Sequence, residues 1–396
     1  MTRYLSSAFP GTGGTIKETP EDFHVEEIPL YHPCGEGEHL YLRIEKTGLT
    51  TFDLLQRLAR ALGIREREIG YAGLKDARAT TIQTVSVPAA AEAQLPALEI
   101  SGAKLLSAQR HRNKLRPGHL AGNRFTIRVR NPGTDALDRA RDILHVLEQT
   151  GVPNRFGAQR YGVLENSHRI GRALVRGDFS AAIWEIIGDP ARIVDPRWRQ
   201  GAELYREGRL EEAGAALPGR MREEKRMLHR LQEDGNPRSA VLDLPRKLLR
   251  LYLSAYQSQL FDRLVEMRLD SIDLIWLGDL AYKHDNGACF SVTDPEAEQV
   301  RAERFEISPS GPLCGYKTKL ATAQAGILEE SLLEKEGVKL EDFRLGGGLN
   351  MEGERRPLRV PLKDVAIEAD QGDLSLRFTL PRGSFATSVL AEIMKP

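Results

Sequence analysis

Residues 71–83 read Tyr71-Ala-Gly-Leu-Lys-Asp-Ala-Arg-Ala-Thr-Thr-Ile-Gln83 and form the densest polar constellation of the chain. Gly73 permits a tight backbone approach, and Lys75, Asp76 and Arg78 bring opposite charges within four positions. A carboxylate held among cations stays ionised at neutral pH, which suits a nucleophile better than a general acid. The local chemistry therefore predicts either a nucleophile at Asp76 or a salt bridge within a loop, and does not choose between them.

The segments that precede this stretch predict a mixed α and β unit. Residues 40–44 alternate apolar and less apolar positions, as a half-buried strand does. Residues 52–62 place their leucines and alanines on one helical face. Gly63 is suited to close this helix, and Thr50 or Thr51 is suited to cap its start.

The segment that follows is strongly basic. From Ile100 to Thr134 there is no Asp or Glu, although the whole chain has 56 basic and 56 acidic residues, so acidic residues must concentrate elsewhere. Residues 125–130 alternate as a strand with an arginine row on one face. Phosphate recognition depends on where charge lies and not on its sum. The stretch predicts a solvated basic face or a phosphate-binding surface, and its basic residues are Lys104, Arg110, Arg112, Lys114, Arg116, Arg124, Arg128 and Arg130.

Further along, the chain changes character twice. Helical periodicity marks residues 134–151, 222–231 and 245–265. The first of these helices opens at Thr134 as its capping residue and ends at Gly151. Strand alternation returns at residues 373–380, before a short helix within 383–394. Mixed, then helical, then mixed again is the pattern expected when one domain is inserted into another.

Composition argues against several classes of function. Cys34, Cys289 and Cys314 are too few and too far apart for a disulfide framework or a metal clamp, and the nine histidines show no ligand spacing. Nucleotide-loop, zinc-protease and serine-hydrolase motifs are absent. No run reaches the ~18 apolar residues of a spanning helix, and the N-terminus lacks the apolar core of a signal peptide. We expect a cytoplasmic protein whose ordinary side chains carry out acid, base or nucleophilic chemistry.

Five motifs in order make the chain resemble the TruD family of tRNA pseudouridine synthases. The Gly-x-Lys-Asp motif is at Gly73 to Asp76, with Thr81 and Gln83 downstream. The other four are Lys-x-x-Pro-Glu-Asp-Phe within residues 16–26, Gly-Asn-x-Phe within 115–125, the segment 151–162 that leads into the family's insertion, and Phe-Ala-Thr-Ser within 383–389. Together they cover most of the chain and are highly specific. Between about 166 and 306 the resemblance is positional only.

The resemblance implies an α+β fold with a pseudouridine-synthase catalytic domain, in which helices flank a central, mostly antiparallel sheet. Residues 1–150 and 360–396 would form this domain, and residues 151–359 a largely helical inserted TRUD domain. The resemblance also implies the site residues. Asp76 would be the catalytic aspartate, with Lys17 as its basic partner where other branches use arginine; Phe125 would stack on the flipped-out uracil, Phe23 and Phe385 would line the pocket, and Asn123 would hydrogen-bond the nucleotide or fix its loop.

By the same resemblance, the substrate is uridine at position 13 of tRNA, and the reaction needs no cofactor or metal. We expect a monomer that binds tRNA and no membrane. Ionised Asp76 would assist cleavage of the glycosidic bond, either by attacking C1′ or by initiating loss of the 2′ proton. Two alternatives remain: a tRNA-binding module of the same fold without catalysis, and a hydrolase with paired carboxylates such as Asp285 and Asp294.

Overall fold

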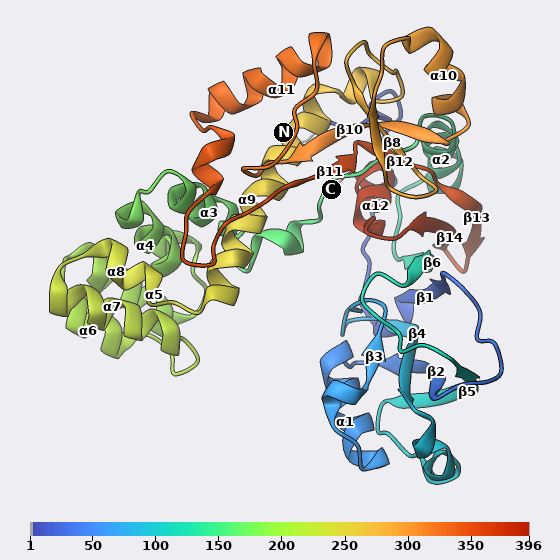
Figure 1. Cartoon of the computed structure of the whole chain (residues 1–396), viewed down its shortest axis with the longest axis horizontal. Helices are drawn as coiled ribbons and strands as arrows, with labels where there is room; N and C mark the ends of the chain where they lie inside the picture. The colour runs from blue at the N-terminus through green and yellow to red at the C-terminus, as the bar shows by residue number, and fades with distance from the viewer. Residues whose placement is uncertain (1–2, 396) are drawn as a thin grey trace. The chain divides into compact units, whose positions relative to one another are not determined.

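The structure is a computed structural model that describes residues 3–395. Contacts between residues divide the chain into two compact units (Figure 1). Unit 1 consists of Met1–Val152 and Val360–Pro396, and unit 2 of Pro153–Arg359. The borders predicted from the sequence lie at 150/151 and 359/360.

Unit 1 is built on one eight-stranded sheet with the order β13-β14-β6-β1-β4-β2-β5, and β3 also pairs with β4. Its strands are β1 (Phe23–Pro29), β2 (His39–Thr47), β3 (Gly70–Tyr71), β4 (Thr80–Pro88), β5 (Ala103–His111), β6 (Leu120–Val129), β13 (Lys363–Asp370) and β14 (Asp373–Pro381). The pair β1/β4 is parallel, and the other pairings between these strands are antiparallel. The predicted α+β fold with a mostly antiparallel sheet is therefore confirmed.

Two separate groups of helices cover apolar parts of this sheet. α1 (Thr51–Leu62) packs its leucines on the apolar side chains of β2 and β4. α2 (Ala136–Thr150) and α12 (Ala386–Met394) share a second core with β6 and β14. In β6, Phe125, Ile127 and Val129 are buried while Arg124 and Thr126 are exposed, as the alternation predicted.

The ends of the predicted helices in unit 1 are largely where the sequence placed them. Thr50 caps α1 by accepting from the backbone N–H of Asp53, and Gly63 closes the helix in a left-handed conformation with φ of +65°. Only the start of α2 differs from the prediction, because its N-cap is Asp135 and not Thr134. Asp135 makes no side-chain capping bond, so the capping pattern that singled out Thr134 is not used here.

Unit 2 is mostly helical, with helices α3 (Ser167–Val175), α4 (Phe179–Ile187), α5 (Pro196–Arg206), α6 (Leu210–Ala216), α7 (Arg222–Asp234), α8 (Pro237–Leu242), α9 (Arg246–Met267), α10 (Pro295–Glu303) and α11 (Ala323–Glu336). It also contains a four-stranded sheet that the sequence pattern did not predict, in the order β11-β10-β8-β9. These strands are β8 (Leu280–Lys283), β9 (Cys289–Ser291), β10 (Ile307–Leu313) and β11 (Glu354–Pro357). α9 is buried along most of its length between α3, α11 and β10.

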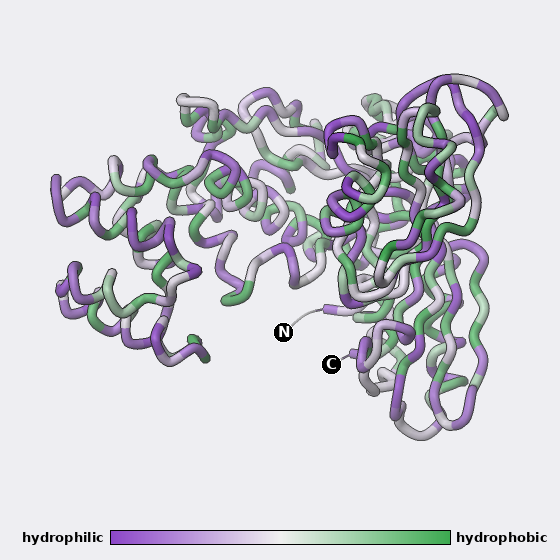
Figure 2. Tube along the Cα trace, turned by 90° about the horizontal axis from the view of Figure 1, so that it is seen from below, coloured by the Kyte–Doolittle hydropathy of each residue, from purple (hydrophilic) through white to green (hydrophobic). Residues whose placement is uncertain are grey.

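Short elements complete the chain. β7 (Val152–Pro153) and β12 (Arg359–Val360) pair with each other where the chain passes between the units. The 3-10 helices are η1 (Pro20–Asp22), η2 (Glu66–Glu68), η3 (Ala89–Ala97), η4 (Ala158–Tyr161), η5 (Pro190–Arg192), η6 (Leu269–Ser271) and η7 (Leu340–Phe343). Hydrophobic and hydrophilic residues alternate over short distances along the trace (Figure 2), and no helix within residues 3–395 is long and apolar enough to cross a membrane.

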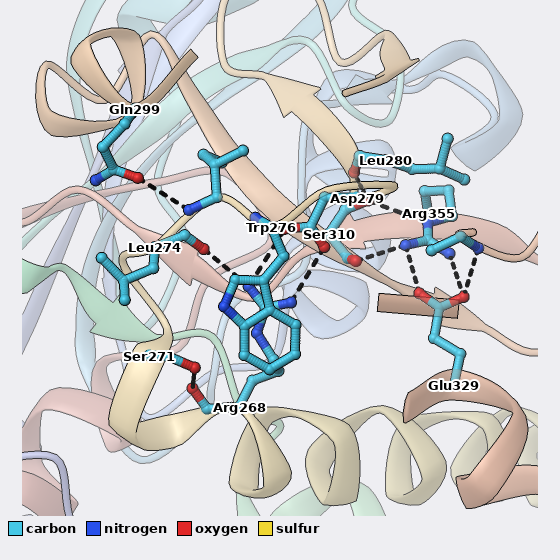
Figure 3. Close-up of polar contacts among 12 residues, drawn as sticks. Arg268, Ser271, Leu274, Trp276, Asp279, Leu280, Gln299, Ser310, Glu329 and Arg355 are labelled. Atoms are coloured by element: carbon cyan, nitrogen blue, oxygen red, sulfur yellow. Dashed lines mark hydrogen bonds and ion pairs between the residues drawn. The ribbon is translucent and has the colours of Figure 1, made fainter. Parts of the chain in front are cut away.

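Buried ion pairs organise the interior of unit 2 (Figure 3). Arg268 and Asp279 are each 2% exposed and lie 3.1 Å apart, with the Arg268 guanidinium 3.5 Å from the centroid of the Trp276 ring. Arg355 pairs in the same way with Glu329 at 2.7 Å. Each charge has lost its water, so loss of one partner would leave the other charge uncompensated.

Candidate active site

Lys17 lies in a turn that is anchored by an ion pair between the buried Asp22 and the partly exposed Arg130. Thr15 forms a β-bridge with Arg130, and Asp22 accepts from the backbone N–H of Thr19 at 2.9 Å and from the Arg130 guanidinium at 2.7 and 2.9 Å. The bond from Arg130 holds the pKa of Asp22 below its usual range. Lys17 itself has φ of +60°, a conformation that costs a residue other than glycine about 1–3 kcal/mol and that is enriched at functional sites.

The carboxylate of Asp76 lies against this lysine. Its Oδ2 is 2.5 Å from Lys17 Nζ, and its Oδ1 accepts from the backbone N–H of Arg78 at 3.0 Å. The side chains of Lys17 and Asp76 are 17% and 32% exposed, so the pair is fixed in place but reachable from solvent. A carboxylate paired with an ammonium group is ionised at neutral pH. The structure thus brings together the two residues that the sequence singled out as catalytic.

The backbone before Asp76 is tied to α1 and β4 by a chain of hydrogen bonds. The N–H of Lys75 donates to Thr51 Oγ1 at 2.9 Å, and the Thr51 hydroxyl donates to Gln83 Oε1 at 3.1 Å. Thr51 begins α1 and Gln83 lies in β4, so both regular elements hold the loop. Thr51 and Gln83 are buried, which protects these bonds from competition with water.

The side chain of Lys75 points inward and joins two strands. Its Nζ donates to Asn123 Oδ1 in β6 at 2.7 Å and lies 3.1 Å from Glu27 Oε1 in β1. Glu27 also accepts from the backbone N–H of Thr84 in β4 at 2.9 Å. The side chains of Lys75 and Glu27 are only 6% and 4% exposed. Asn123 thus holds the side chain of Lys75, the residue before Asp76, and its expected contact with the nucleotide remains a prediction.

Lys46 is a second buried cation beneath the loop. Its Nζ donates to the backbone oxygen of Asp76 at 3.2 Å and also to the backbone oxygen of Leu49. Burial lowers the pKa of Lys46 to about 8, although the negative charge of Asp76 partly opposes this effect. Lys46 thus adds positive charge near Asp76 and holds its main chain.

The phenylalanines expected in the pocket lie in three different settings. The ring of Phe23 has Lys17 Nζ 4.2 Å from its centroid, so it borders the ion pair directly. Phe125 is only 6% exposed, with its ring 6.2 Å from that of Phe23 and 5.4 Å from that of Phe378. Phe385 is 39% exposed at the N-cap of α12. Stacking of uracil on Phe125 and a pocket role for Phe385 remain predictions.

The basic stretch between residues 100 and 134 is largely neutralised by acids from other parts of the chain. Five of its arginines pair with carboxylates: Arg110 with Glu92, Arg112 with Glu36, Arg124 with Glu26, Arg128 with Asp370 and Asp373, and Arg130 with Asp22. These partners lie outside residues 100–134, so a count of charges within the stretch did not reveal them. Within residues 3–395, Lys104, Lys114 and Arg116 are the members of the stretch without an ion pair, and they are the stronger candidates for phosphate contacts.

Sequence reasoning missed Lys46 and Glu27, although a signal for both existed. Extending the inward alternation of β2 beyond Leu42 and Ile44 reaches Lys46, and extending that of β1 beyond Val25 reaches Glu27. A charged residue at an inward position of a half-buried strand requires a partner. The carboxylates named for a hydrolase lie elsewhere in the chain, in unit 2, where Asp294 caps α10 through the N–H of Ala297.

Comparisons with known proteins agree over the whole chain. A family model described as tRNA pseudouridine synthase D (TruD) matches residues 1–393. Proteins named tRNA pseudouridine synthase D from Syntrophotalea carbinolica and Geobacter metallireducens are 61% and 57% identical to this chain; the alignments cover 100% and 99% of this chain and 99% and 98% of the relatives. A crystal structure of a putative tRNA pseudouridine synthase D from Methanosarcina mazei superimposes with a TM-score of 0.86 at 27% identity, covering 100% of this chain and 96% of that one.

Proposed function

The chain belongs to the TruD family and is a tRNA pseudouridine synthase, and we propose that the carboxylate of Asp76 is the group that begins the reaction on the ribose of the target uridine. The observation that carries this proposal is the Lys17–Asp76 ion pair, 2.5 Å long and partly exposed to solvent. Lys46 and the N–H of Arg78 add further support to the same aspartate.

The reaction breaks the N1–C1′ bond of uridine, turns the freed uracil and joins C5 to C1′. The hydrogen on C5 leaves to solvent and N1 gains a proton, so atoms balance without an oxidant or reductant. Ionised Asp76 starts this sequence by attacking C1′ or by removing the 2′ proton. Lys17 orients the carboxylate in both routes, while Lys75 and Thr51 hold the loop that presents it.

Access of Asp76 to the ribose requires that the target base leave its stack, which costs a few kcal/mol. An aromatic ring returns about 1–3 kcal/mol when a base stacks on it. Phe23, directly beside Lys17, supports this step, and we extend the proposal to Phe125, Phe385 and Asn123 as further contacts of the nucleotide. We also propose that the target is uridine 13 of tRNA, modified by a single copy of this chain.

The test is the variant Asp76→Asn, which keeps the shape of the side chain and removes its charge. Release of tritium from C5-labelled uridine in tRNA is expected to fall on the order of 10⁴-fold or more, because the missing group acts in the chemical step. tRNA affinity is expected to stay within a few fold. Asp138→Asn, on an exposed part of α2, is the matched control and should leave tritium release unchanged.

Full activity in Asp76→Asn would refute the assignment. Wild-type protein that binds tRNA and releases no tritium would instead support a binding module without catalysis. Mapping of pseudouridines in tRNA from cells without this gene tests which uridine is the target. Loss of the pseudouridine at position 13 is expected. Loss of a pseudouridine at another position alone would refute the assignment of uridine 13.

A further inference from the structure

A cavity lies in unit 1, and neither Lys17 nor Asp76 is among its lining residues. Its volume is about 280 Å³, near the lower end of the range for ligand pockets, which is roughly 300–1,000 Å³. Its lining includes Tyr41 and Arg43 of β2 and Thr84 of β4. These positions alternate with Leu42, Ile44 and Gln83, whose side chains point toward α1 or its first residue, so the cavity lies over the opposite face of the sheet.

Aromatic rings form one wall of this cavity. The lining rings are those of Tyr31, Tyr41 and His119. His111, which lines the adjoining hollow, supports two of them, with its ring 5.2 Å from that of Tyr31 and 4.7 Å from that of Tyr41. Hydrogen bonds fix their orientation: the Tyr31 hydroxyl lies 2.8 Å from Nδ1 of His119, and the Tyr41 hydroxyl donates to the backbone oxygen of Asn113 at 3.0 Å. Burial raises the pKa of Tyr41, so this phenol is neutral. Oriented aromatic rings beside a base-sized space are suited to stacking with a nucleobase.

The remaining lining can hydrogen-bond the edge of a base. Gln109 and Thr84 offer an amide and a hydroxyl, and Arg43 offers a guanidinium that pairs with Glu26. Such groups supply both donors and acceptors, as the Watson–Crick edge of an unstacked base requires.

Positively charged side chains line a hollow that adjoins the cavity. A second, more open hollow of about 510 Å³ shares Tyr31 and His119 with the cavity and is also lined by Lys114 and Arg116. Lys114 and Arg116 are two of the three cations of the basic stretch that lack an ion pair within residues 3–395. Lys114 donates to the backbone oxygen of Arg67 at 2.6 Å, a neutral acceptor that does not compensate its charge. An aromatic pocket beside two free cations matches a base joined to a phosphate.

The loop that carries these cations is bonded to the catalytic loop. The N–H of Gly118 donates to the backbone oxygen of Ala72 at 2.8 Å, and Ala72 lines the cavity four residues before Asp76. Glu27 also lines the cavity and pairs with Lys75, next to Asp76. An occupant of the cavity would therefore be held against the same segment that presents the catalytic carboxylate.

We propose that this cavity is a second nucleotide site, which takes one unstacked base of the RNA substrate other than the target uridine, with the adjoining phosphate at Lys114 and Arg116. The proposal rests on the tRNA-modifying function above and adds a contact that positions the RNA. A nucleotide within the RNA is favoured over a free mononucleotide because the cavity adjoins a larger hollow lined by the two cations, which offers space for a continuing chain.

The test compares His119→Ala and Arg116→Ala with Arg60→Ala, an exposed arginine of α1 away from the cavity. Loss of one stacked base or one phosphate contact is expected to raise KM for tRNA about tenfold, with kcat within twofold of wild type. For Arg116→Ala, the slope of log affinity against log salt should also fall by about 1. KM values equal to that of Arg60→Ala in both variants would overturn the proposal, as would a loss confined to kcat.

A second measurement does not depend on catalysis. tRNA that contains 4-thiouridine is bound to Asp76→Asn protein and irradiated, and the cross-linked peptides are identified. Cross-links within residues 31–43 or 109–119 are expected, and their absence would overturn the second site whatever the fate of Asp76. Excess uridine 5′-monophosphate or adenosine 5′-monophosphate, added before irradiation, should not reduce these cross-links. A reduction that requires His119 would assign the site to a free nucleotide and refute the RNA assignment.

Discussion

The buried pair of Glu27 and Lys75 should control the stability of the sheet beneath the active site. The two charged atoms are 3.1 Å apart and almost without solvent exposure. At an effective dielectric constant of about 20, their attraction is about 5 kcal/mol. Removal of one partner from such a pair costs about 3–5 kcal/mol, because the other charge stays buried and uncompensated. Glu27→Gln should therefore destabilise unit 1 by about 3–5 kcal/mol.

The assay must report on unit 1 alone. The three tryptophans, Trp184, Trp198 and Trp276, are all in unit 2, so tryptophan fluorescence serves as an internal control that should not change. Hydrogen exchange of peptides from β1 and β4 measures the opening of the sheet. Because Lys75 also positions Asp76, tritium release should fall together with protection of these peptides.

Matched variants separate burial from charge. Glu92→Gln removes the carboxylate of an ion pair that is about half exposed on both sides, and should cost less than about 1 kcal/mol. Glu27→Leu combined with Lys75→Met should be less destabilised than either single change, because neither charge remains buried. If Glu27→Gln opens β1 and β4 no more than Glu92→Gln does, the reasoning about the buried pair is wrong.

Three further predictions concern other parts of the chain. The pKa of Lys46 falls from 10.5 in the unfolded chain to about 8 in the fold, so the unfolded state binds more protons between these pH values. The free energy of unfolding of the wild type relative to Lys46→Met should therefore rise from pH 8 to 10.5, by up to about 3 kcal/mol. A difference in urea titrations that does not change with pH would contradict this. Gly70→Ala would place a methyl group 2.2 Å from the backbone oxygen of Leu115, so faster hydrogen exchange of residues 113–120 and a loss of about 1–3 kcal/mol are expected. Arg268→Met should destabilise unit 2 by about 3–5 kcal/mol in urea followed by tryptophan fluorescence, while exchange in β1 stays as in wild type.

Local patterns predicted regular elements better than they predicted partners. The helix at α1 and the strand at β6 follow from apolar spacing within a dozen residues, and the structure places both as expected. The four-stranded sheet of unit 2 was missed, because β8 and β9 are only four and three residues long and Pro309 and Pro312 interrupt β10. Short strands lack the repeats on which an alternation argument depends.

The site shows the same contrast. Asp76 and Lys17 were singled out by motif, and they lie in contact although 59 residues separate them. The pairing of Arg128 and Arg130 with Asp370, Asp373 and Asp22 depends on which strands become neighbours. That arrangement is a property of the whole sheet, so a count of charges along a segment overestimated the basic surface.

Unit 1 needs two segments that are far apart in the sequence. β14 lies beside β6, and the carboxylate of Glu392 accepts from the N–H groups of Leu5 and Ser6. During translation, the more than two hundred residues of unit 2 are synthesised between the two segments of unit 1, so these contacts form only afterwards. The helices of unit 2 can assemble as they leave the ribosome. Until then the nascent chain exposes the edge of β6 that β14 later covers, and an unpaired edge favours aggregation. Formation of the full sheet of unit 1 is thus coupled to synthesis of the segment 360–396.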